Sequence, residues 1–188
     1  MDAGSKIPFF TIGHSTRSLA ELIGLLRSAR VQLLADLRTV PRSRTNPQFN
    51  RDTLPAALAA ADISYEHMAA LGGLRPKSRT VAPEVNAFWT NESFHNYADY
   101  ALSEDFRVAL LRLLEEGRER RCAIMCSEAV WWRCHRRIVT DYLIAHHEAV
   151  FHIMEHGRLE AAQPTPGAIV RPDATVVYPA ADPQLPLV

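Results

Sequence analysis

Short apolar runs alternate along the chain with segments whose apolar residues recur every three or four positions. The apolar runs at residues 8–12, 31–37, 122–125 and 149–154 predict buried β-strands, and residues 63–68 are a weaker strand candidate. Strands that alternate with amphipathic helices are typical of a mainly parallel sheet with helices on both faces. The pattern therefore predicts an α/β fold.

Four segments with helical spacing of apolar residues lie between or beside these strands. We expect the helices to begin at capping residues and to end at glycine or polar residues. The expected features are a capping box of Ser18 and Glu21 before a helix over residues 19–26, a helix that begins at Asp52 or Thr53, a helical region over residues 94–116 that ends at Gly117, and a helix over residues 131–146.

The end of the chain has a different composition. The last 27 residues contain six of the twelve prolines and no helical period. We expect residues 1–161 to form the α/β domain and residues 162–188 to form an extension that packs on it or trails from it. Within this extension, residues 175–178 are expected to form an edge strand.

Composition and charge narrow the class of protein. Over 188 residues, 47% are hydrophobic and 22% are charged, as in an ordinary globular protein. A formal net charge of zero argues against an overall polyelectrolyte that binds nucleic acid or membranes. There is no cationic-then-apolar leader, and no apolar run approaches the ~20 residues of a membrane span. Three cysteines, an odd number, favour a reducing cytoplasm over a disulfide framework.

Reactive side chains follow three of the predicted strands. His14 and Ser15 follow the first strand, Arg38 follows the second, and Cys126 and Glu128 follow the fourth strand candidate along the chain. The carboxyl ends of parallel strands line the crevice in which α/β proteins bind ligands. We therefore expect these side chains to meet at one edge of the sheet.

The residue types at this edge indicate thiol chemistry on an anion. A thiol near a helix N-terminus and arginines is stabilised as the thiolate, so Cys126 is the candidate nucleophile or redox thiol. His14 and Glu128 would handle protons, and Arg38 and Arg136 would clamp the anion. The alternative for Cys126 is a buried structural cysteine.

The loop over residues 38–51 is rich in arginine and contains no acidic residue. Its Arg42 side chain and its amides could bind a phosphorylated ligand or a nucleic-acid backbone, with Phe49 available to stack on a base. The alternative is a solvated basic loop in which Arg38 pairs with Asp36 or Glu128. Nucleic-acid binding without catalysis, through this loop and residues 133–137, is the second functional hypothesis.

A metal site is the third hypothesis. Cys126, Cys134 and His135 would supply ligands, with His14 as a fourth. Adjacent Cys and His residues on a helix point about 100° apart, which argues against it. His152, like the other histidines near the carboxyl end, is expected at the surface or at a helix end. The sequence contains no Walker, dinucleotide-binding or zincin motif and indicates no particular cofactor.

Six of these segments together resemble the bacterial family called "domain of unknown function 488". The resemblance covers residues 12–178 and implies a small cytoplasmic α/β domain in which the Cys-x-Glu and Cys-His-Arg motifs lie close together. It implies no particular reaction. The motifs are Ile-Gly-His-Ser-Thr at 12–16, Asp-Leu-Arg at 36–38, Asn-Pro-Gln-Phe-Asn at 46–50, Leu-Gly-Gly at 71–73, Cys-Ser-Glu at 126–128 and Cys-His-Arg at 134–136. The thiol, histidine and arginine residues at the strand ends carry the leading hypothesis, a small enzyme that acts on an anionic, phosphorylated or nucleotide-like substrate.

Overall fold

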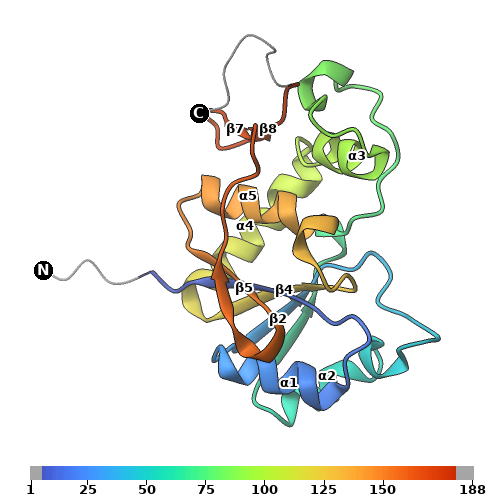
Figure 1. Ribbon diagram of the computed structural model, residues 1–188, viewed down its shortest axis with the longest axis vertical. Helices are drawn as coiled ribbons and strands as arrows, with labels where there is room; N and C mark the ends of the chain where they lie inside the picture. The colour runs from blue at the N-terminus through green and yellow to red at the C-terminus, as the bar shows by residue number, and fades with distance from the viewer. Residues whose placement is uncertain (1–5, 181–188) are drawn as a thin grey trace, which may run out of the picture.

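A six-stranded sheet forms the centre of the protein in the computed structural model, which describes residues 6–180 (Figure 1). The strand order is β3-β2-β4-β1-β5-β6; β1 to β5 are parallel and β6 is antiparallel to β5. The predicted α/β fold with a mainly parallel sheet is confirmed. The strands are β1 (Phe9–Gly13), β2 (Leu33–Asp36), β3 (Ser64–His67), β4 (Cys122–Cys126), β5 (Val150–Ile153) and β6 (Leu159–Ala161).

Helices cover both faces of this sheet, as predicted. On one face, α1 (Leu19–Ser28) and α2 (Leu54–Ala59) pack against Phe10 and Leu34. On the other face, Phe9 and Leu33 belong to a second cluster built with the three remaining helices. Consecutive strand residues point to opposite faces, so a strand that is buried on both sides reads as a continuous apolar run. The remaining helices are α3 (Glu92–Tyr100), α4 (Glu104–Glu119) and α5 (Arg136–Ala145).

Local signals placed the start of α1 correctly and the start of α5 wrongly. The capping box is present, because Ser18 Oγ accepts from Glu21 N and Ser18 N donates to the Glu21 carboxylate. The predicted helix over residues 131–146 begins only at Arg136. Residues Trp131–Arg133 form a 3₁₀ turn, and Cys134 has an extended backbone at φ −129° and ψ 146°. This break decides where the Cys134 side chain goes.

Gly117 is not the end of its helix, because α4 continues to Glu119. A methyl group at Gly117 would lie 2.0 Å from Phe9 Cζ. The absence of a side chain at Gly117 therefore lets the aromatic ring of Phe9 in β1 pack against the helix. A glycine that permits close packing looks the same in sequence as a glycine that stops a helix. The difference is visible only in the packing.

We expect Gly117→Ala to lower the free energy of unfolding by about 1–3 kcal/mol, because the added methyl overpacks the core at Phe9. Gly24 in α1 is the matched control, since a methyl there meets no atom within 4 Å. Gly24→Ala should instead stabilise the protein by about 0.5–1 kcal/mol through helix propensity. Urea denaturation of both variants checks this; a stabilised Gly117→Ala variant would contradict the packing role.

The extension after β6 packs back on the α5 side of the molecule. The Tyr178 side chain is fully buried, and its hydroxyl donates to Asp141 Oδ2 of α5 at 2.8 Å. The predicted edge strand is present as β8 (Val176–Val177), which pairs with β7 (Ile169–Val170) in a separate two-stranded sheet. Residues 181–188 of the expected extension lie outside the described residues. Within the described part of the chain, no helix is both long enough and apolar enough to cross a membrane.

Candidate functional site

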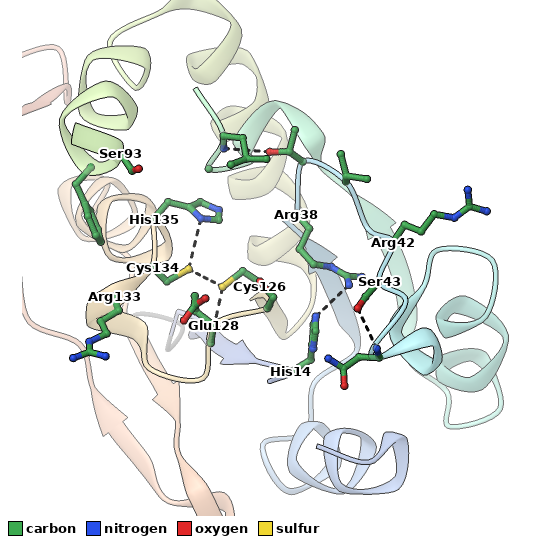
Figure 2. A pocket seen from close by; sticks show the side chains of 17 residues that line it. His14, Arg38, Arg42, Ser43, Ser93, Cys126, Glu128, Arg133, Cys134 and His135 are labelled. Carbon is green, nitrogen blue, oxygen red and sulfur yellow. Dashed lines mark hydrogen bonds between the residues drawn. The ribbon is translucent and has the colours of Figure 1, made fainter. Parts of the chain in front are cut away.

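A pocket of about 570 Å³ opens at the carboxyl edge of the sheet (Figure 2). The order β2-β4-β1 makes the ends of three strands neighbours there, with Gly13 opposite Cys126 and Asp36 opposite Met125. The loops that follow these strands therefore supply most of the pocket wall. Further wall comes from Gly73, Leu74 and the start of α3.

Five of the seven predicted site residues line this pocket and two do not. Ser15 lies outside it; its backbone N–H donates to the carbonyl of Ser127. Arg136 is 1% exposed, and its Nε is directed at Cys134 Sγ from behind the pocket wall. The five that line it are His14, Arg38, Arg42, Cys126 and Glu128.

Two thiols lie in contact at the centre of the site. Cys126 Sγ, at the end of β4, is 2.6 Å from Cys134 Sγ, just before α5 (Figure 2). Cys126 is 2% exposed and Cys134 is 3% exposed, and both residues line the pocket. Sequence reasoning considered Cys134 only as a metal ligand and missed it as the partner of Cys126. The Cys-His-Arg motif was the signal that pointed to it.

Hydrogen-bond donors converge on Cys134. Arg136 Nε lies 3.4 Å from its sulfur, Arg136 N lies 3.5 Å from it, and His135 Nδ1 lies 3.6 Å from it. Arg136 N is the first amide of α5, so the positive end of the helix dipole also faces the sulfur. Cys126 has a different second partner, because its thiol donates to the carbonyl of Glu128 at 3.9 Å. Donors favour a thiolate at Cys134, and an acceptor favours a protonated thiol at Cys126.

The pKa values of the two thiols move apart accordingly. Burial alone would raise the pKa of Cys134, but hydrogen bonds from Cys126 and His135 and the charge of Arg136 outweigh it and hold the pKa well below its usual value. Burial raises the pKa of Cys126 well above the usual value, and the hydrogen bond to Cys134 adds to this. A proton on Cys126 and a negative charge on Cys134 fit this arrangement of donors and acceptors.

Arg136 serves the thiol pair rather than the open pocket. Besides its contacts with Cys134, its Nη2 donates to the carbonyl of Glu128 at 2.6 Å. A guanidinium buried to this degree needs a nearby negative group. Cys134 is the ionisable side chain that it contacts. Arg136 does not line the pocket, so nothing in the structure supports its predicted role as a clamp for ligand.

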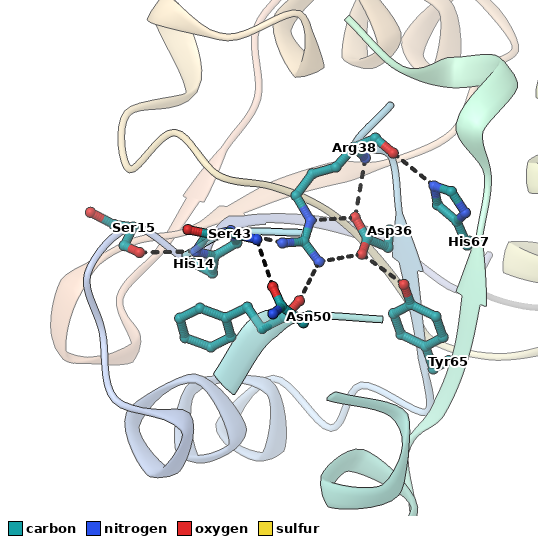
Figure 3. Close-up of polar contacts among 9 residues, drawn as sticks. His14, Ser15, Asp36, Arg38, Ser43, Asn50, Tyr65 and His67 are labelled. Atoms are coloured by element: carbon teal, nitrogen blue, oxygen red, sulfur yellow. Dashed lines mark hydrogen bonds and ion pairs between the residues drawn. The ribbon is translucent and has the colours of Figure 1, made fainter. Parts of the chain in front are cut away.

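Arg38 is likewise engaged within the protein (Figure 3). Its Nε and Nη2 donate to the two oxygens of buried Asp36 at 2.8 and 2.6 Å, and Nη2 also donates to the carbonyl of Phe49. The hydroxyl of Tyr65 donates to the same Asp36 carboxylate at 2.8 Å. This is the alternative reading of Arg38, as the partner of Asp36. Its Nη1 points to His14 at the pocket wall.

His14 is held on all sides. Its Nδ1–H donates to the carbonyl of Ser15 at 2.9 Å, and Nε2 lies 3.2 Å from Arg38 Nη1, which fits an acceptor nitrogen. Burial lowers the pKa of His14, and Arg38 adds to this against the opposing hydrogen bond to Ser15. The imidazole is neutral at pH 7 and stacks on Phe49 at 4.3 Å. Phe49 is fully buried, so the expected stacking of this ring on a nucleic-acid base is wrong.

Gly73 permits the approach of His135 to the thiolate. A methyl group at Gly73 would lie 2.5 Å from His135 Nδ1, the atom that contacts Cys134 Sγ. Only a residue without a side chain leaves the imidazole in its observed place. The Leu-Gly-Gly motif at residues 71–73 thus bears on the thiol site although it is far from it in sequence.

His152 is a buried residue behind this site, which corrects the expectation of a surface histidine. It is 2% exposed, its Nδ1 contacts Thr11 Oγ1 at 2.8 Å, and its ring stacks on Trp131 at 4.3 Å. Burial, with a smaller contribution from the Arg136 charge, lowers its pKa to about 4. Its Nε2 has no hydrogen-bond partner among the described residues.

Two arginines leave positive charge at the pocket rim. Arg42 and Arg133 line the pocket, are exposed, and form no ion pair within residues 6–180. In Figure 2 they lie on opposite sides of the thiol pair and extend away from it. Glu128 is the one carboxylate in the wall, against the three guanidiniums of Arg38, Arg42 and Arg133. The exposed charge at the pocket mouth is therefore mainly positive.

The metal-site hypothesis requires a group of side chains that could together hold a metal ion. In the described range, no group of three or more His, Cys, Asp or Glu side chains is placed to hold one. The metal-binding alternative stays a prediction.

Comparison with known families agrees with five of the six motifs, because the motif at residues 12–16 lies outside the matched range. The family model described as "Domain of unknown function DUF488" matches residues 18–143, which is more than half of the chain. No curated protein and no solved structure matches the chain.

Proposed function

The chain belongs to the DUF488 family, and we propose that it is a cysteine-dependent enzyme that acts on a small anionic substrate. The observation that carries the proposal is the convergence of Arg136, His135 and the Cys126 thiol on Cys134 Sγ, inside a pocket of about 570 Å³. Thiolates stabilised in this way are nucleophiles. A cavity of this size fits a small molecule.

Cys134 is the better candidate for the nucleophile than Cys126, which the sequence favoured. The thiolate is the reactive form of cysteine, and the donors that stabilise it surround Cys134. Cys126 keeps its proton beside the carbonyl of Glu128. In the proposed reaction Cys134 attacks the substrate, while Cys126 donates the hydrogen bond that stabilises the attacking sulfur.

Proton transfer falls to Glu128 more readily than to His14. The Glu128 carboxylate lines the pocket, and it forms no hydrogen bond with any residue in the described range 6–180. His14 has both ring nitrogens engaged, so it would have to leave Arg38 or Ser15 to accept a proton. Its neutral ring and the Arg38 guanidinium instead provide a polar surface for the substrate.

The positive rim supports an anionic substrate. Arg42 and Arg133 are exposed and stand apart from acidic partners, so their field reaches solvent at the pocket mouth. An anion that enters between them meets Arg38 deeper in the wall. Such a field raises the association rate of anions and weakens as salt screens it.

Alkylation of Cys134 by iodoacetate and by iodoacetamide tests this proposal, because the two reagents differ in charge and not in reaction. We expect the double variant R42Q/R133Q to lose about tenfold in its rate with the anionic reagent and little with the neutral one. Quantifying the alkylated Cys134 peptide gives both rates. R44Q is the control from the same loop, since exposed Arg44 does not line the pocket.

Equal rate losses with both reagents would mean that the variants disturb Cys134 itself. No loss with iodoacetate would remove the anionic substrate from the proposal. Cys134 labelling no faster than that of a free thiol would remove its role as nucleophile.

Nucleic-acid binding remains the second candidate, because Arg44 and Arg51 are also exposed and form no ion pair in the described region. Burial of Phe49 removes the stacking group that this hypothesis used. Retention of RNA or DNA that weakens steeply with salt would favour it over the enzyme.

A further inference from the structure

We infer that Cys126 and Cys134 form a reversible disulfide, and that the site exchanges thiols with small anionic disulfides. The inference rests on the proposed role of Cys134 as the attacking thiolate. It adds a second catalytic thiol, Cys126, and a substrate class, organic disulfides whose substituents carry negative charge.

The geometry of the pair supports bond formation. The two sulfurs are in contact at 2.6 Å, with no other group between them. Cys126 ends β4, and Cys134 lies in the extended segment between the 3₁₀ turn and α5. Both backbones are anchored by regular structure, and the loop between them is short. Bringing the sulfurs together needs no rearrangement of the sheet.

The two thiols differ in the way that thiol–disulfide exchange requires. Cys134 is surrounded by donors and lines the pocket, so it can attack an incoming disulfide. Cys126 holds a proton next to the Glu128 carbonyl and is already in contact with Cys134. It is placed to attack the mixed disulfide on Cys134 and release it.

The exchange balances with the disulfide as oxidant. The Cys134 thiolate attacks one sulfur of RSSR, which forms the Cys134–SR bond, breaks the S–S bond of the reagent and expels RS⁻. The expelled RS⁻ takes the proton of Cys126. The Cys126 thiolate then attacks Cys134 Sγ, which forms the Cys126–Cys134 disulfide and expels the second RS⁻. One RSSR is reduced to RSH and RS⁻, and the Cys134 thiolate and the Cys126 thiol are oxidised to the disulfide. A dithiol such as dithiothreitol reverses the change.

Arg136 biases the pair toward the dithiol. In the reduced protein its buried guanidinium faces the Cys134 thiolate, and in the disulfide that negative charge is absent. A dithiol whose reduced form is stabilised belongs to a readily reduced, oxidising disulfide. The pair is therefore suited to catalytic exchange rather than to a structural disulfide. Among the described residues Cys122 has no such partner; burial raises its pKa to about 12 at the start of β4.

The charge of the pocket selects among disulfides. Arg42 and Arg133 at the rim and Arg38 in the wall favour reagents with carboxylates over neutral ones. Dithiobis(nitrobenzoate), an anionic aromatic disulfide, and dithiodipyridine, a neutral one, are the two probes. Each releases a coloured thiol that is counted directly.

With dithiobis(nitrobenzoate), the native protein should release two equivalents of thiol rapidly. Its mass should then be lower by two hydrogen atoms, with no adduct, and the linked peptide should join Cys126 to Cys134. C126S should release one equivalent and retain the mixed disulfide on Cys134. C134S should react at least about tenfold more slowly. C122A, which removes a core thiol outside the pocket, should behave as the native protein does.

The outcomes separate the two proposals. A native protein that stops at one equivalent, with a lasting adduct on Cys134, would overturn the disulfide and leave the Cys134 nucleophile intact. A native protein that reacts no faster than C134S would overturn both. Each rate is divided by the rate of the same probe with a free thiol. Equal ratios for the neutral and the anionic probe would overturn the substrate class.

Discussion

Replacing Arg136 with methionine is expected to lower the free energy of unfolding by about 3 kcal/mol or more and to make Cys134 an ordinary, unreactive thiol. Arg136 is almost wholly buried, and its contacts run to Cys134 Sγ and to the carbonyl of Glu128. Breaking a buried charged pair by removing one partner is strongly destabilising. Urea denaturation gives the stability, and the rate of alkylation of Cys134 gives the reactivity.

Arg133→Met is the matched control for this change. Arg133 is three residues away in sequence and exposed, so its replacement should alter stability by no more than about 0.5 kcal/mol. A double-mutant cycle with C134A adds a second test. If the thiolate and the guanidinium stabilise each other, C134A/R136M is less destabilised than the sum of the single variants, by about 0.5–3 kcal/mol. Additive effects would mean that Arg136 contributes only packing and its contact with the Glu128 carbonyl.

His152 is expected to make the protein about 3 kcal/mol less stable at pH 4 than at pH 6.5. Burial lowers its pKa from 6.5 to about 4, with a smaller contribution from Arg136. Between these pH values the unfolded chain binds a proton at His152 and the folded protein does not, so stability falls as the pH falls through this window. Below about pH 4 the contribution of His152 is constant.

His152→Gln isolates this contribution, because it removes the titrating group. The difference in unfolding free energy between the native protein and the variant should shrink by about 3 kcal/mol from pH 6.5 to pH 4, as measured by urea denaturation at each pH. His147→Gln is the control, since this histidine is exposed at the end of α5. A difference that stays constant with pH would show that His152 is not held neutral in the core.

The sequence predicted the elements whose signals are local or periodic. Apolar runs located β1, β2, β4 and β5, and the Ser18–Glu21 capping box located the start of α1. The gathering of reactive residues at one edge was expected from strand ends. It follows from the order β2-β4-β1, which makes those ends adjacent.

The errors arise where tertiary contacts decide the outcome. Gly117 is placed in the sequence where a helix would end, but it lies inside α4 and leaves room for the ring of Phe9. Residues 131–135 have helical spacing, yet the backbone at Cys134 is extended and no helix runs through it. That break places the Cys134 sulfur against Cys126 and among the donors of His135 and Arg136. No periodicity in a single sequence carries this information.

The arginines illustrate the same limit. Arg38 and Arg136 were the expected ligand clamps because they follow reactive motifs. The structure commits Arg38 to Asp36 and Arg136 to Cys134, and leaves the exposed positive charge at Arg42 and Arg133. Charge alone does not say which guanidinium has a partner, because the partner of Arg136 is a cysteine, and its contacts exist only in the folded protein.

The pH dependence of Cys134 alkylation by iodoacetamide in the native protein measures the central claim directly. The reagent is neutral, so its rate follows the thiolate fraction, and the alkylated Cys134 peptide can be counted apart from Cys126 and Cys122. We expect the rate to rise and level off below the ordinary thiol pKa of about 8.5, with Cys126 unreactive over the same range. A Cys134 rate that is still rising through pH 8.5 or above would contradict the account.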